Sequence, residues 1–145
     1  MSQQLGFTLR NKTNSKIKLE AGWFSTTPAR DMSRESNLRY TENEINIDED
    51  FLKETLADLK DKLDSYIKSQ ASIEKKMQDL KETAYKCTSP DVVARILEKI
   101  EDLQNDWNGY QEEIEDYQYY VNKIEFISDL YSENKEEWNL YYYNY

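Results

Sequence analysis

Carboxylates are the side chains in this sequence whose number and spacing could do chemistry. Seven of them lie between Ile100 and Asn122, a stretch without a basic residue: Glu101, Asp102, Asp106, Glu112, Glu113, Glu115 and Asp116. Paired carboxylates act as general acid and base in glycosidases, and several carboxylates together bind Mg²⁺. Both uses need a concave pocket, and a run of acids along a narrow helical bundle does not predict one.

Other reactive side chains are scarce. The 145 residues include no His and a single Cys, Cys87. This composition removes the commonest general base, the Ser-His and Cys-His nucleophile pairs and the usual zinc ligand sets. Only three glycines are present, so no Gly-rich phosphate-binding loop can be formed. We therefore expect a protein that is not an enzyme and that uses no metal or cofactor.

The acidic run can act instead as a ligand for a basic surface. On a helix that rises about 1.5 Å per residue, it supplies about one charge per 3 to 4 Å, close to the ~3.4 Å phosphate spacing along one DNA strand. Such a helix should repel nucleic acid and suit a basic nucleic-acid channel in a partner protein. The alternative is a solvated face, partly neutralised across the bundle by Lys60, Lys62, Lys68, Lys75 and Lys76.

The net charge of −10 is unevenly distributed along the chain. Residues 1–40 carry seven basic and three acidic side chains, so the excess of acid lies entirely in the remainder. The first strands contain Arg10, Lys12, Lys16 and Lys18, which suit an acidic partner or phosphate, or protect a sheet edge from aggregation. No secretion signal and no run of about 20 apolar residues is present, so we expect a cytoplasmic protein that binds no membrane.

The elements that position these side chains can be predicted from periodicity. Leu5 to Arg10 and Lys16 to Phe24 alternate between apolar and polar residues around a turn-forming segment, 11–15, which predicts a β-hairpin within residues 1–25. On its second strand, Ile17, Leu19, Ala21 and Trp23 are expected to share one face. Residues 26–50 show no sustained period and are predicted to be a connector, with a short turn near Leu38 and Tyr40.

Two long helices are expected next, over residues 51–86 and 90–132. In each, apolar residues recur at spacings of three and four, and this apolar line along the helix is called the seam. The first seam breaks only at Gln70, where a polar residue can fix the register. Thr88-Ser89-Pro90 predicts a tight turn, since Pro suits the first helical position. The dipeptide Asn108-Gly109 leaves a break in the second helix open, although the unbroken period favours continuity.

The C-terminal tail, residues 133–145, is rich in aromatic residues. Tyr141, Tyr142, Tyr143 and Tyr145 could form an interface with a second copy, because Tyr combines a large contact area with a hydroxyl group. The favoured alternative is that the tail completes the small core where the helices end. The predicted fold is therefore mainly α, in one domain: a long antiparallel helical hairpin, coiled-coil-like, with an N-terminal β-hairpin and a Tyr-rich tail packing at the helix ends.

These features together predict a non-catalytic acidic protein-binding module. Its seven carboxylates would occupy the basic nucleic-acid-binding surface of a partner, as a stoichiometric inhibitor does. In general character, and without a shared motif, a small acidic His-free chain with a helical rod is similar to phage inhibitors of nucleic-acid-binding defence enzymes, including anti-CRISPR proteins. That similarity implies a viral nucleic-acid mimic in the host cytoplasm. Two alternatives stay open: an assembly protein that oligomerises through its aromatic end, and an antitoxin-like partner of a basic protein.

Overall fold

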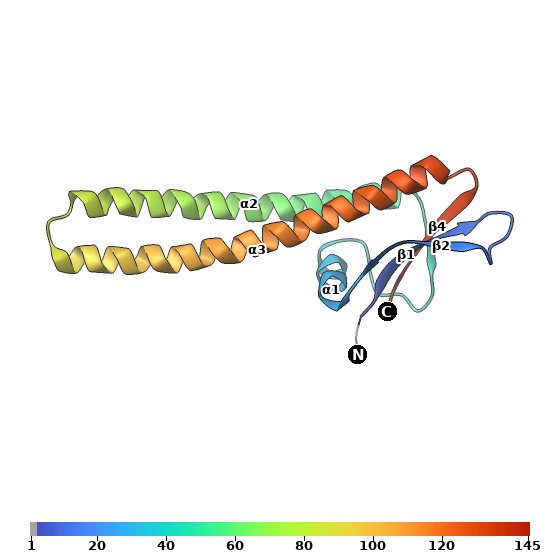
Figure 1. The fold of residues 1–145 in the computed structure, drawn as a ribbon, viewed down its shortest axis with the longest axis horizontal. Coiled ribbons are helices and arrows are strands. Elements are labelled where there is room, and N and C mark those ends of the chain that lie inside the picture. Colours follow the sequence, from blue (N-terminus) through green and yellow to red (C-terminus); the bar gives the residue numbers. More distant parts are fainter. Residues whose placement is uncertain (1–2) are drawn as a thin grey trace. The chain divides into compact units, whose positions relative to one another are not determined.

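The structure, a computed structural model, describes residues 3–145 and contains three helices and four strands over that range. In chain order they are β1 (Leu5–Asn11), β2 (Lys18–Phe24), α1 (Thr26–Glu35), β3 (Ile45–Ile47), α2 (Glu49–Lys86), α3 (Pro90–Asn134) and β4 (Trp138–Asn144) (Figure 1). The two long helices α2 and α3 pack as a helical hairpin, and β1 and β2 form an antiparallel β-hairpin. The predicted fold class is confirmed.

The ends of the long helices follow from their local sequence. At the start of α2, Asp48 Oδ1 accepts a hydrogen bond from the Phe51 amide at 2.8 Å, and Glu49 and Asp50 occupy the first turn. Such acids offset the partial positive charge of a helix N-terminus. The chain reverses between Lys86 and Pro90, where the predicted turn is confirmed. α3 is continuous through Asn108-Gly109, because its seam holds the same phase on both sides of that dipeptide.

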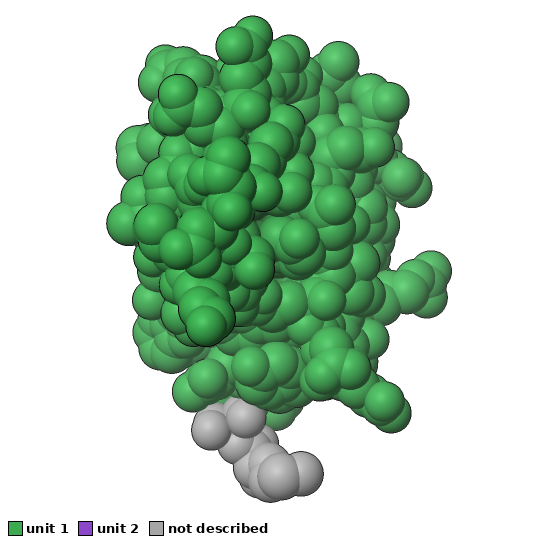
Figure 2. All heavy atoms as spheres, turned by 90° about the vertical axis from the view of Figure 1, so that its right-hand side faces the viewer, with its two compact units in different colours: residues 1–62, 117–145 green, residues 63–116 purple. Residues whose placement is uncertain are grey.

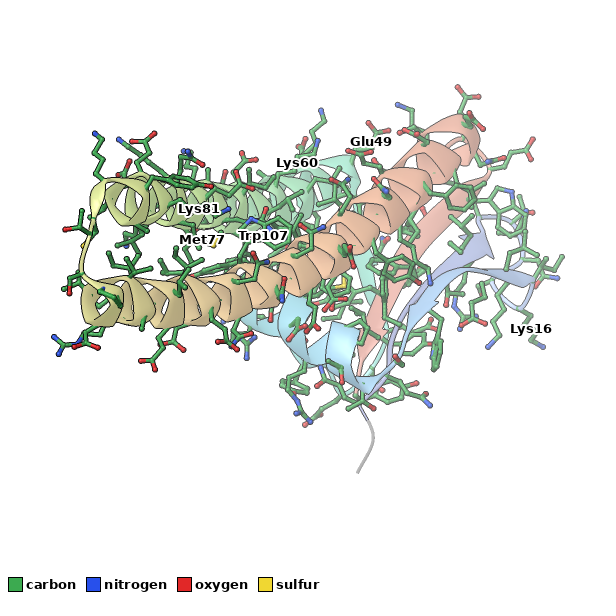
Figure 3. All side chains as sticks on the ribbon, turned by 60° about the vertical axis from the view of Figure 1, so that its left-hand side comes forward. Lys16, Glu49, Lys60, Met77, Lys81 and Trp107 are labelled. Carbon is green, nitrogen blue, oxygen red and sulfur yellow. The ribbon has the colours of Figure 1, made fainter. Side chains whose placement is uncertain are left out.

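The chain divides into two compact units. Unit 1 comprises residues 1–62 and 117–145, and unit 2 comprises residues 63–116. Figure 2 shows one face of unit 1. Unit 2 is the turn-proximal part of the helical hairpin, and its thin core is formed by Leu63, Ile73 and Met77 of α2 and Ile96 of α3. Met77 and Trp107 lie between the two helices (Figure 3). Two helices alone cannot enclose a wider core, so most side chains of unit 2 remain in contact with water.

Unit 1 is built on a four-stranded antiparallel sheet with the order β2-β1-β4-β3. One face of β1 carries Leu5, Phe7 and Leu9, all buried. The helices pack on this face, as shown by the Phe51 ring stacked on Tyr142 at 5.3 Å and the Phe24 ring at 6.4 Å from Tyr120. Further core side chains on the helices and connecting segments are Ala29, Met32, Leu38, Leu52, Leu59, Tyr117, Val121, Ile124 and Ile127.

The connector predicted for residues 26–50 holds regular structure. It contains α1, which buries Ala29 and Met32, and the three-residue strand β3. The tail is also a strand, β4, which lies between β1 and β3. These elements escaped prediction because they are short and depend on partners far away in the sequence. β3 exists only by pairing with β4, where Ile45 lies opposite Tyr142 and Ile47 opposite Leu140, more than 90 residues further along the chain.

The expected apolar face of the second strand is wrong. The β1–β2 register shifts between Phe7 and Thr8, so that Phe7 pairs with Gly22 and Thr8 with Glu20. Ala21 is therefore an extra residue, a β-bulge, and such a residue reverses the side-chain alternation. Leu19 lies on the face of Leu9, whereas Trp23 lies on the opposite face with Gly6. Both remain exposed, and the buried face of the hairpin belongs mainly to β1.

Candidate acidic protein-binding surface

The seven predicted carboxylates all lie on α3 within unit 2. We call them the acidic stripe. Six of them are exposed and Glu113 is half-buried. At 100° per residue, Glu101, Glu112 and Asp116 fall within about 60° of one another around the helix, on the side away from the seam. The other four acids lie within about 110° of the middle of this line, so the seven spread over about half of the helix circumference. The structure therefore brings the predicted residues together along one exposed side of α3.

Contacts of the seam hold that side of α3 toward water. The Trp107 indole Nε1–H donates to Glu74 Oε1 of α2 at 2.8 Å, and the Tyr66 and Tyr110 rings lie 6.1 Å apart. Gln70 Nε2 donates across the hairpin to Gln111 Oε1 at 2.8 Å. These three contacts all join α2 to α3, so they fix the rotation of α3 about its axis and with it the direction of the acids.

Lysine pairing leaves most of the acidic stripe without a partner. Of the lysines expected opposite it, Lys60 pairs with Glu125 at 3.1 Å and Lys62 with Glu35 at 3.8 Å, both in unit 1. Lys68, Lys75 and Lys76 form no ion pair with any residue of 3–145. Over the same range, four acids of the stripe form neither an ion pair nor a side-chain hydrogen bond: Glu101, Asp102, Asp106 and Glu112. Glu115 also forms no ion pair with a described residue, but it accepts a hydrogen bond from Gln111 Nε2 at 3.2 Å. Their charge is available to a partner.

The charge of unit 2 is also segregated along its length. Residues 101–116 carry seven acids and no base, whereas residues 68–100 carry five acids and seven bases. The acidic excess is therefore local to one segment of α3. Exposed charges more than about 8 Å apart are largely screened at physiological ionic strength, so the distant bases do little to cancel it.

A shallow open hollow adjoins the stripe. It is lined by Ile73 of α2 and by Asn105, Asp106, Gly109, Tyr110 and Glu113 of α3. At Gly109 an added Cβ would meet no other atom within 4 Å, so the absence of a side chain there opens the surface. The hollow combines two carboxylates with apolar surface, which suits the long stem and charged end of Lys or Arg. Sequence reasoning treated Gly109 only as a helix breaker and missed this recess.

Gln70, the polar residue in the seam of α2, forms a hydrogen bond across the hairpin to Gln111, and its effect on stability can be measured. A polar residue at one seam position sets the register of a coiled coil at some cost in stability. Because the three-residue turn already sets the register here, Gln70→Leu should raise the free energy of unfolding by about 1 kcal/mol. Urea unfolding followed by circular dichroism measures this change. Gln78→Leu, on the exposed side of α2, is the control and should change stability little. A Gln70→Leu protein that is less stable than wild type would show that the hydrogen bond between Gln70 and Gln111 contributes more than the burial of their polar groups costs.

The four tail tyrosines occupy different environments. Tyr142 is buried and its hydroxyl donates to the Arg39 carbonyl at 3.3 Å, and burial raises the pKa of that hydroxyl. Tyr141 and Tyr143 are half-buried on the opposite face of the sheet, where the pKa of Tyr143 is raised by burial and by nearby Glu20. Only Tyr145 is largely exposed, at 58%. Tyr142 is thus part of the core, which removes it from the surface that another chain could contact.

Comparison with known proteins gives no relative from which a function could be transferred. No protein-family model, no curated protein and no solved structure matches the chain. Within residues 3–145, no three His, Cys, Asp or Glu side chains are grouped so that they could hold a metal ion. In the same part of the chain, no helix has both the length and the apolar character needed to cross a membrane.

Proposed function

We propose that this protein is a non-catalytic acidic module that binds the basic, nucleic-acid-binding surface of a partner protein and inhibits it stoichiometrically. The observation that carries the proposal is the acidic stripe: four of its carboxylates face water on one side of α3 without an ion pair to any described residue. A helix with charges at this spacing presents to a basic channel what one DNA strand presents.

The expected energetics follow from the exposure of these groups. An exposed ion pair contributes about 0.2–1 kcal/mol, so four new pairs give about 1–4 kcal/mol, less than a stable complex needs. We propose that the remainder comes from the hollow beside the stripe, where Ile73 and Tyr110 offer apolar contact to a basic side chain. The charges would mainly steer association, which should slow steeply as salt is added.

Neutralising the four unpaired acids should abolish binding to such a partner. The variant carries Glu101→Gln, Asp102→Asn, Asp106→Asn and Glu112→Gln, which keep side-chain volume while removing four charges. The immobilised protein is used to capture proteins from a lysate of its source cells, with identification by mass spectrometry. We expect the wild-type chain to retain basic nucleic-acid-binding proteins that duplex DNA displaces, and the variant to lose them.

A matched control removes four exposed charges elsewhere. Asp64→Asn, Asp79→Asn, Glu82→Gln and Glu98→Gln change the net charge equally within unit 2 but leave the stripe intact. This control should retain the captured proteins. If both variants lose them to the same degree, binding depends only on net charge; if the stripe variant keeps them, the proposed surface is wrong.

A further inference from the structure

The edge strand β2 leaves part of its backbone open to pairing. It is the outermost strand of the sheet. The Asn11 amide donates to the Ile17 carbonyl at 3.0 Å, so Ile17, and by alternation Leu19, bond toward β1. The backbone N–H and C=O groups of Lys18 and Glu20 therefore point outward. An open edge of this kind is a template for another strand.

The open part of β2 also exposes apolar side chains. Ile17, which directly precedes β2, is 51% exposed. Leu19 is 55% exposed, although it lies on the helix-covered face of the sheet. At the other end of β2, Lys123 Nζ of α3 donates to the Trp23 carbonyl and lies 4.6 Å from the Phe24 ring, which covers that end. The exposed side chains of Ile17 and Leu19 thus lie next to the unpaired backbone of Lys18 and Glu20.

The charged side chains of β2 favour one register for pairing between two copies of this strand. Two copies of β2 can pair antiparallel about a two-fold axis. The helix-covered faces of the two sheets then lie on the same side only if the axis passes through a residue, which lies opposite the same residue of the other copy. An axis at Lys18 would oppose two lysines, and an axis at Glu20 would oppose two glutamates. An axis at Leu19 places Lys18 opposite Glu20 of the other copy, twice, and joins the two Leu19 side chains.

We infer that two copies of this chain associate through β2, antiparallel, with Leu19 on the two-fold axis. In this register Lys18 and Glu20, whose backbone groups point outward, form hydrogen-bonded pairs across the interface. Opposite charges directly across an antiparallel pair stabilise it. Lysines usually protect an edge strand, but Glu20 makes this edge complementary to itself. The inference is independent of the proposed function, since it uses no residue of the acidic stripe.

Charge reversal tests the register. By light scattering after size exclusion, the wild-type chain should have the mass of a dimer at tens of micromolar. Lys18→Glu places four carboxylates at the interface and Glu20→Lys places four ammonium groups, so each single variant should be monomeric. The double variant Lys18→Glu with Glu20→Lys restores opposite charges and should be dimeric again. Both residues are exposed, and the one hydrogen bond that Glu20→Lys removes, from the Tyr143 hydroxyl to Glu20 Oε1, is long at 3.4 Å, so both variants should fold, as circular dichroism would check. A monomeric wild-type chain at all concentrations overturns the inference.

Cross-linking tests the axis directly. Leu19 of the two copies would form a non-hydrogen-bonded pair with Cα atoms about 4.5 Å apart, within the range of a disulfide. With Cys87→Ser as background, Leu19→Cys should therefore give a covalent dimer under mild oxidation. Ile17→Cys should not, because its two copies would lie about 14 Å apart. Dimers cross-linked equally well by both variants, or through Ile17→Cys alone, would show a different interface.

Discussion

Truncation of the chain after Glu137 should unfold unit 1. The deleted strand β4 pairs with β1 along seven residues and with β3 along three, so its loss removes the centre of the sheet. It also removes the buried side chains Leu140, Tyr142 and Asn144. Burial of each large apolar side chain contributes about 1.5–3 kcal/mol. Truncation also exposes the faces of β1 and of the helices that β4 covered, which loses a similar amount of burial energy. The sum is comparable to the total stability of a domain, about 5–15 kcal/mol.

Near-ultraviolet circular dichroism and urea unfolding measure this effect. The truncated chain should lose its aromatic signal, while the helical signal of residues 63–116 persists in part. A graded version is Leu140→Ala, which should cost about 2–5 kcal/mol because Leu140 is fully buried. Tyr145→Ala is the matched control at the exposed end and should cost less than 1 kcal/mol. A truncated chain that keeps the native aromatic signal would show that the core does not need the tail, and would favour a role of the tail as an interface with another chain.

Replacement of Asn144 by aspartate should destabilise the protein by about 3–5 kcal/mol, the usual cost of a buried charge without a partner. The Asn144 side chain is fully buried and its amide is fully used. Its Nδ2 donates to Ser33 Oγ and to the Leu38 carbonyl at 2.9 Å, and its Oδ1 accepts from Gln3 Nε2 at 2.8 Å. Asn144→Asp keeps the shape but turns the Leu38 contact into one between two acceptors.

The pH dependence of this variant provides a second measurement. Burial should raise the pKa of the new carboxyl group in the folded state, so the folded state favours the protonated form. The loss of stability should then be smallest near pH 4 and grow as pH rises toward the folded-state pKa. Asn46→Asp, on the exposed side of β3, is the control and should change stability by less than about 0.5 kcal/mol. Equal losses in both variants at all pH values would contradict this role of Asn144.

The helical hairpin could be predicted because its signal is local and repeated. Residues such as Leu59, Leu63 and Tyr110 recur at the helical spacing over many turns, and the turn at Ser89-Pro90 has its own chemical signature. The exposure of the acidic stripe follows from the same spacing, since residues between seam positions must face outward. Which acids the lysines pair with did not follow, because Lys60 pairs with Glu125 of the other long helix and Lys62 with Glu35 of α1, and tertiary folding brings these partners together.

Local sequence is sufficient to predict the two long helices, their reversal and the side of α3 on which the carboxylates lie, because each depends on residues within a few positions of one another. The other elements depend on contacts between distant parts of the chain. α1, β3 and β4 are too short to be stable alone, and the tail became a central strand only because β1 and β3 offered it hydrogen bonds on both edges. The bulge at Ala21 likewise depends on how β2 meets β1, and it placed Trp23 on the face opposite Leu19.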